Sequence, residues 1–135
     1  MIINIKNCIE ELNEFIKTKN WFEEVPNKDV EPFKIVNQNI IFDRRYGQNK
    51  YLKLQIKEIE KRFLNKINNE QTRREILKYS NKVHKRLDIK LIEVIDNILK
   101  THNIDNIIFE NVFGSILYKK ENNNWKPYPY FHTHE

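Results

Sequence analysis

A hydrophobic repeat in the middle of the chain sets the strongest limit on its fold. From Ile76 to Ile98 apolar residues recur at steps of three and four, the spacing of one face of an α-helix. The repeat predicts helix over about 70–101, either as one long helix or as two that break near Asp88, because aspartate often caps a helix N-terminus. The face comprises Ile76, Ser80, Val83, Leu87, Leu91, Val94 and Ile98.

Shorter patterns on either side predict an α+β fold in a single domain over residues 1–135. A three- and four-residue apolar repeat indicates a helix over about 4–19. The next segment contains two prolines and indicates a loop, from which Trp21 and Phe22 fold back onto the core. Apolar runs separated by Asn, Gln and Gly then favour a small antiparallel β-meander of strands at about 33–36, 40–45 and 50–57.

The third of these strands is ambiguous in the sequence. Leu52, Leu54 and Ile56 alternate as in a strand, whereas Leu52, Ile56 and Ile59 also fit a helical stripe. We favour strand to about residue 57 and helix from there to 67. At the C-terminus, residues 106–131 predict a β-hairpin whose last strand lies at a sheet edge, because Pro127 and Pro129 cannot donate to a ladder.

Charge is segregated along the chain. The formal net charge of +5 divides into −3 over residues 1–31, +10 over 32–90 and −2 over 91–135. Lys, Asn and Ile number 18, 19 and 20, a composition typical of an AT-rich genome, so the total charge says less than its distribution. The central segment favours a polyanion or an acidic protein as partner.

Two groups of cations form the predicted polyanion-binding surface within residues 44–86. Arg74, Lys78, Lys82 and Lys85 fall within about 80° of one another on the long helix, roughly opposite its predicted apolar face. Arg44, Arg45, Lys50 and Lys53 form a second group, and Tyr46 and Tyr51 between them can stack on unpaired bases. The sequence therefore predicts a cytoplasmic binding protein for nucleic acid or another polyanion.

The same basic surface also suits a protein partner. An immunity, antitoxin-like or phage-type accessory protein would dock it on an acidic protein, where complementary charge speeds association. The two hypotheses are nearly level, and nucleic acid is favoured because the basic segment also contains tyrosines.

An enzymatic alternative rests on Asp43, near the end of one apolar strand, and on Gln55 and Lys57 near the end of the next. With Glu11 and Glu14 on the first helix, this arrangement resembles the restriction-endonuclease-like nucleases, whose core runs helix, three strands, helix, strand. The resemblance implies a Mg²⁺-dependent nuclease, since carboxylates in that family hold the metal that activates water. Gln55 departs from the pattern, because an uncharged amide stands where the family has a carboxylate.

Other chemistry has weaker support in the sequence. His132 and His134 share one face of an extended strand, but two imidazoles do not complete a metal site, so no metal or cofactor is expected. Cys8 is the single cysteine and lies on the apolar side of the first helix, which indicates a packing role in a reducing compartment. No glycine-rich phosphate loop, signal peptide or membrane span is apparent, and no membrane partner is expected.

Overall fold

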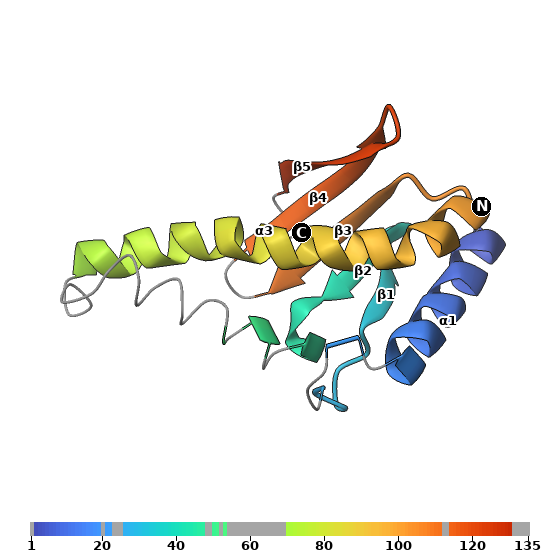
Figure 1. Cartoon of the computed structure of the whole chain (residues 1–135), viewed down its shortest axis with the longest axis horizontal. Coiled ribbons are helices and arrows are strands. Elements are labelled where there is room, and N and C mark those ends of the chain that lie inside the picture. Colours follow the sequence, from blue (N-terminus) through green and yellow to red (C-terminus); the bar gives the residue numbers. More distant parts are fainter. Residues whose placement is uncertain are drawn as a thin grey trace.

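The computed structural model describes residues 2–19, 21–22, 26–47, 50–51, 53, 70–111 and 114–130, with side chains from residue 5 in the first helix and from residue 84 in the long one. Over these residues the fold is α+β, as predicted. Helices α1 (Ile2–Lys19) and α3 (Glu70–Thr101) accompany a five-stranded sheet (Figure 1). Neither described helix combines the length and apolar character that a bilayer-spanning segment requires.

The sheet has the strand order β1-β2-β3-β4-β5 and is mostly antiparallel. Strands β1 (Phe33–Val36) and β2 (Asn39–Asp43) form one hairpin, and β4 (Gly114–Glu121) and β5 (Asn124–Tyr130) form another. Between them lies β3 (Asn106–Asn111), antiparallel to β4 and parallel to β2, with Phe42 opposite Phe109. A parallel pair needs a long crossover, and α3 belongs to the connection that supplies it.

The first two predicted strands and a C-terminal hairpin whose last strand lies at the sheet edge are confirmed, but residues 106–120 contain two strands, β3 and β4, instead of one. The predicted three-stranded meander is wrong. Lys50, Tyr51 and Lys53 are helical, and the remainder of the 50–57 strand lies outside the described residues. The second strand ends at Asp43 and continues into the 3₁₀ turn η1 (Arg44–Gly47). The second neighbour of β2 in the sheet, besides β1, is therefore β3, which is more than sixty residues away in the chain.

The long helix is one continuous element of 32 residues, and Asp88 lies inside it instead of capping it. Its buried face is rotated from the predicted one by about a quarter of a turn. Leu87 and Leu91 are buried as expected, but Val94 is 40% exposed. The face that packs on the sheet comprises His84, Asp88, Leu91, Ile92, Ile95 and Leu99.

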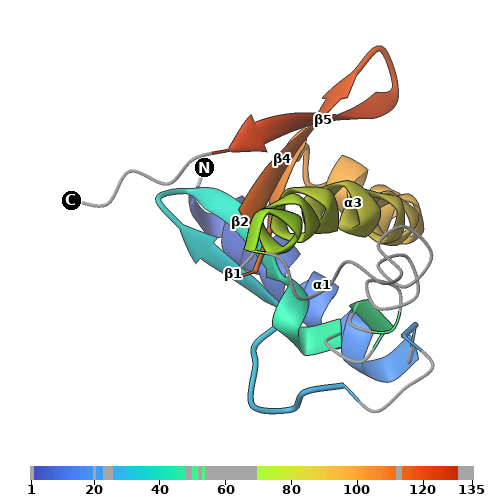
Figure 2. The ribbon, with the colours of Figure 1, turned by 90° about the vertical axis from the view of Figure 1, so that its left-hand side faces the viewer.

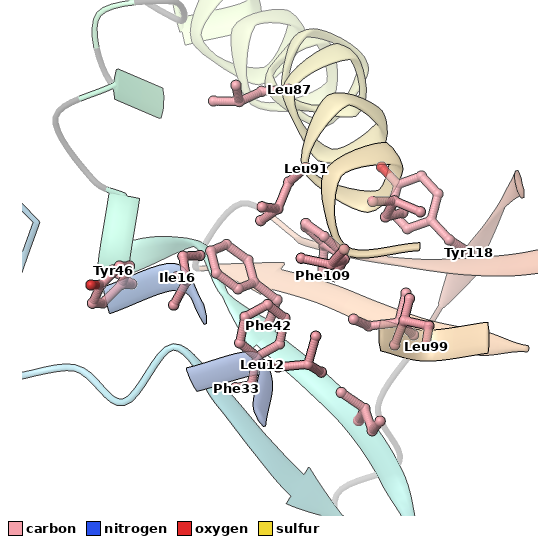
Figure 3. Packing of buried hydrophobic residues seen from close by; sticks show 14 of the residues in the cluster. Leu12, Ile16, Phe33, Phe42, Tyr46, Leu87, Leu91, Leu99, Phe109 and Tyr118 are labelled. Atoms are coloured by element: carbon pink, nitrogen blue, oxygen red, sulfur yellow. The ribbon is translucent and has the colours of Figure 1, made fainter. Parts of the chain in front are cut away.

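The core lies between the two helices and one face of the sheet. Figure 3 shows side chains from α1, α3 and the strands converging there, with Phe42 among the aromatic rings at the centre. The centroid of the Phe42 ring lies 5.0 Å from that of Phe33 and 5.0 Å from that of Phe109. The edge hairpin is tied to α3 at Asp96, which accepts hydrogen bonds from Lys120 at 3.2 Å and from the Trp125 indole at 2.8 Å.

Candidate functional site

Arg44, predicted to lie on the basic surface, is in the interior of the protein. Its guanidinium forms a two-point ion pair with Asp88 of α3, Nη2 to Oδ2 at 2.7 Å and Nε to Oδ1 at 3.2 Å, and both side chains are fully buried. Burial would lower the pKa of Arg44, but the charge and hydrogen bonds of Asp88 outweigh it and raise that pKa. The arginine therefore stays charged and is unavailable to an outside ligand.

Two tyrosines complete the environment of the Asp88 carboxylate. Tyr51 donates to Oδ1 at 2.6 Å, and Tyr118 of β4 donates to Oδ2 at 2.5 Å. Burial, followed by the negative charge of Asp88, raises the pKa of both phenols, so both remain protonated donors. We call Arg44, Asp88, Tyr51 and Tyr118 the Asp88 network.

Asn111 and His84 extend this network toward the end of β3. Arg44 Nη1 donates to Asn111 Oδ1 and to the Gly114 carbonyl oxygen, each at 3.3 Å. The Asn111 amide nitrogen in turn lies 3.4 Å from Nδ1 of His84. An amide NH₂ can only donate, so this contact suits an unprotonated Nδ1. Burial, and then the charge of Arg44, lower the pKa of His84 to about 3.

The two tyrosines proposed for base stacking are also interior groups. Tyr46 is 4% exposed and Tyr51 is 3% exposed, and both belong to the hydrophobic core. This is a correction to the predicted surface, because a stacking platform must expose a ring face to the ligand. Tyr46 packs instead against Phe22, at a centroid distance of 6.0 Å, and Tyr51 belongs to the Asp88 network.

The carboxylate of Asp43, the proposed metal ligand, is already held by cations. Arg45 contacts both of its oxygens, with Nη2 at 2.6 Å from Oδ2, and Lys34 Nζ lies 3.2 Å from Oδ2. Burial would raise the pKa of Asp43, but the hydrogen bonds from Arg45 and Lys34 hold it below the ordinary value. A carboxylate neutralised in this way is a poor ligand for Mg²⁺ unless those cations move.

The other parts of the nuclease hypothesis are not assembled around Asp43. Glu11 lies 2.7 Å from Nε2 of His102, which follows α3 and precedes β3, whereas Asp43 is at the opposite end of the β2–β3 pair. Glu14 is exposed on α1, and Gln55 and Lys57 are outside the described residues. Within the described part of the chain, no three His, Cys, Asp or Glu side chains are grouped as metal ligands. His132 and His134 also fall outside it.

The remaining predicted cations come from the residues after η1 and from the first half of α3. Figure 1 shows this half of α3 extending beyond the described strands, and Figure 2 views the molecule from that side. Lys50 has its ammonium 5.1 Å from the centroid of the Trp21 ring, and Lys53 is exposed. Lys85 is half-buried, so it lies on the flank of the packed face and not opposite it. Arg74, Lys78 and Lys82 are helical positions whose side chains are outside the description.

A hollow of about 410 Å³ lies between the end of α1 and η1, and the sequence analysis did not predict it. Its apolar lining comes from the end of α1, the following loop and η1. The apolar lining residues are Ile16, Trp21, Phe22, Pro26 and Tyr46. Lys17 and Lys28 are its charged lining residues within the described chain. Sequence analysis expected Trp21 and Phe22 to pack onto the core, and both do: Phe22 is buried, and Trp21 packs against the core half-buried while lining the hollow.

Comparisons with protein-family models, with curated proteins and with solved structures gave no match. The functional argument therefore rests on the chain's own residues. In sequence, nothing distinguished Arg44 from its exposed neighbour Arg45. A partial signal was present at Asp88 and His84, since the two polar residues are spaced to share a helix face with Leu91 and Ile95.

Proposed function

We propose that the protein is a binding protein that contacts nucleic acid through the first half of α3, together with Lys53. The observation that carries the proposal is the charge polarity of one continuous helix. Residues 70–87 of α3 contain six Lys or Arg and two Glu, whereas residues 88–101 contain two Lys and three acids. The second half packs on the sheet, and the first half extends beyond the described strands (Figure 1).

A row of cations on a projecting helix suits a phosphate backbone. Positions 74, 78, 82 and 85 follow one row of α3 at helical spacing. Each cation that contacts a phosphate releases condensed counterions, so binding of this kind weakens steeply with salt. Such contacts give affinity without base specificity.

Binding is tested by fluorescence anisotropy with single-stranded RNA, single-stranded DNA and duplex DNA between 50 and 200 mM salt, the range over which counterion release is largest. The test variant is Arg74→Gln/Lys78→Gln/Lys82→Gln. The matched control is Lys90→Gln/Lys100→Gln/Lys126→Gln, which removes the same charge from exposed positions elsewhere. We expect the plot of the logarithm of the binding constant against log salt to become shallower in the test variant, its slope decreasing in magnitude by roughly two to three. The control should leave the slope unchanged.

Absence of binding to all three nucleic acids at 50 mM salt would overturn the proposal, as would equal effects of the two triple variants. Equal effects would mean that total charge, and not the α3 row, drives association. Melting temperatures of both variants should match the parent, because glutamine has nearly the same helix propensity as lysine and arginine, and Lys126 is an exposed residue of β5.

A second candidate is an acidic protein partner, as for an immunity, antitoxin-like or phage-type accessory protein. The burial of Tyr46 and Tyr51 favours it, because the basic segment then lacks these two stacking groups. Its test is a one-to-one complex with an acidic protein that the Arg74→Gln/Lys78→Gln/Lys82→Gln variant loses and the control variant keeps. A complex that survives in both variants would exclude the α3 row as its docking surface.

A further inference from the structure

The hollow beside Trp21 has the size and lining of a small-molecule site. Its volume of about 410 Å³ lies within the range of roughly 300–1,000 Å³ that ligand pockets occupy. Three of its lining side chains are aromatic, namely Trp21, Phe22 and Tyr46. Ligand sites combine such walls with a few polar groups that fix orientation.

The aromatic wall is held in place by the core behind it. Phe22 is 3% exposed, and its ring lies 6.0 Å from that of Tyr46 and 6.1 Å from that of Phe42, centroid to centroid. The ring also packs directly onto Gly47, where an added Cβ would come within 2.4 Å of Phe22 Cε1. The wall therefore needs little rearrangement to receive a ligand.

Cations surround this aromatic wall. Lys28 is exposed at the hollow, and Lys50 lies over the Trp21 ring. Lys17 lines the hollow and forms a 3.1 Å ion pair with Glu31, in which both side chains are about half exposed. An exposed pair of this kind contributes little to stability, so an anionic ligand can compete for Lys17.

We propose that the hollow binds a planar aromatic anion of mononucleotide size. Its ring would stack on the half-buried Trp21, beside the buried Phe22 and Tyr46, and its phosphate would lie at Lys17 and Lys28. A purely apolar ligand would leave both ammonium groups unused, and a cation would be repelled by them. The site does not depend on the proposed function, because its residues come from α1, the loop after it and η1, and not from α3.

The probe is adenosine 5′-monophosphate (AMP), measured by isothermal titration calorimetry. Adenosine and ribose 5-phosphate each carry one half of the expected recognition. We expect each to bind at least tenfold more weakly than AMP. Trp21→Leu should weaken AMP binding roughly tenfold to hundredfold, the effect of removing one aromatic–base stack. Lys28→Gln should weaken AMP binding and leave adenosine binding unchanged.

The controls are matched to the site variants. Trp125→Leu removes the other tryptophan, also half-buried, and Lys126→Gln removes another exposed lysine, so both should bind AMP as the parent does. Lys28→Gln changes an exposed side chain, so it tests the site even if Trp21→Leu fails to fold. The Arg74→Gln/Lys78→Gln/Lys82→Gln variant should also bind AMP normally, which separates this site from the α3 surface.

Four results would overturn the proposal. AMP that fails to bind at millimolar concentration excludes a nucleotide site. If adenosine binds as tightly as AMP, the site does not recognise the phosphate. If ribose 5-phosphate binds as tightly as AMP, the site does not recognise the aromatic ring. Affinity for AMP that is unchanged in both Trp21→Leu and Lys28→Gln places the binding elsewhere on the protein.

Discussion

His84 illustrates how buried neighbours fix the state of one side chain. Its Nδ1 faces the Asn111 amide nitrogen, and Tyr51 meets its ring edge to face at a centroid distance of 5.1 Å. The Asn111 amide is oriented by Arg44, whose Nη1 donates a hydrogen bond to the amide oxygen. A proton on Nδ1 would point at an NH₂ group beside a buried guanidinium, so the fold selects the neutral imidazole.

This state makes stability depend on pH. The pKa of His84 is about 3 in the native protein, against about 6.5 in an unfolded chain, so between these values the unfolded chain binds a proton that the native protein does not. The free energy of unfolding should therefore fall as pH drops below about 6.5, by up to about 1.4 kcal/mol per pH unit from this residue.

Urea unfolding of the parent and of His84→Gln between pH 7.5 and pH 5 measures that contribution. We expect the parent to lose about 2 kcal/mol more than the variant over this range, because glutamine does not titrate. Parallel pH profiles for the two proteins would contradict the assignment of a neutral buried imidazole.

At the level of elements, turn chemistry explains both hairpins. Asn37 and Gln38 connect β1 to β2 with φ of 51° and 66°, and Asn122 and Asn123 connect β4 to β5 with 51° and 65°. Two-residue loops with positive φ at both positions match the twist of the flanking strands. Asparagine tolerates this conformation better than most residues, and Gln38 does so less well.

Replacement of Gln38 by glycine should therefore stabilise the protein. Glycine adopts positive φ without steric cost, so Gln38→Gly should raise the free energy of unfolding by roughly 0.5–1 kcal/mol. Asn39→Gly is the control, since Asn39 is in β2, where glycine weakens a strand. Thermal unfolding of both variants gives the comparison, and equal shifts in melting temperature would show that the strain at Gln38 is negligible.

The elements that the sequence predicted well are those set by local patterns. Periodicity and turn residues located α1, the first two strands and the final hairpin. The β2–β3 pair could not be predicted this way, because it joins residues 41–43 to residues 108–110. The packed face of α3 was also ambiguous, since apolar residues occupy two overlapping stripes and the sheet selects the one that contains Asp88. Arg44 and Arg45 have the same chemistry, and only the tertiary position of Asp88 separates them.

At the scale of the whole molecule, the Asp88 network joins parts of the chain that the sheet alone does not. It connects η1, the helical residue Tyr51, α3 and β4, and reaches the β3–β4 connection through Asn111 and Gly114. Gly114 has a φ of 143°, a backbone conformation that side-chain-bearing residues rarely adopt, and its carbonyl accepts from Arg44. Every buried side-chain polar atom in the described residues has a hydrogen-bond partner, so the network carries no unpaired group.

Removal of one charge from this network should be costly, because it leaves the other charge buried without a partner. Asp88→Asn leaves Arg44 fully buried without its counter-charge, and Arg44→Met leaves Asp88 likewise, so each should destabilise the protein by about 3–5 kcal/mol. The double variant Arg44→Met/Asp88→Asn should be destabilised by clearly less than the sum of the two, because the second change removes the charge that the first one stranded.

The exposed Lys17–Glu31 pair is the matched control for this cycle, and Lys17→Met should change stability by at most about 1 kcal/mol. Urea unfolding at pH 7 gives all of the free energies. Additive effects at Arg44 and Asp88 would mean that water or another group compensates each charge. In that case the buried ion pair would not be what holds η1 against α3.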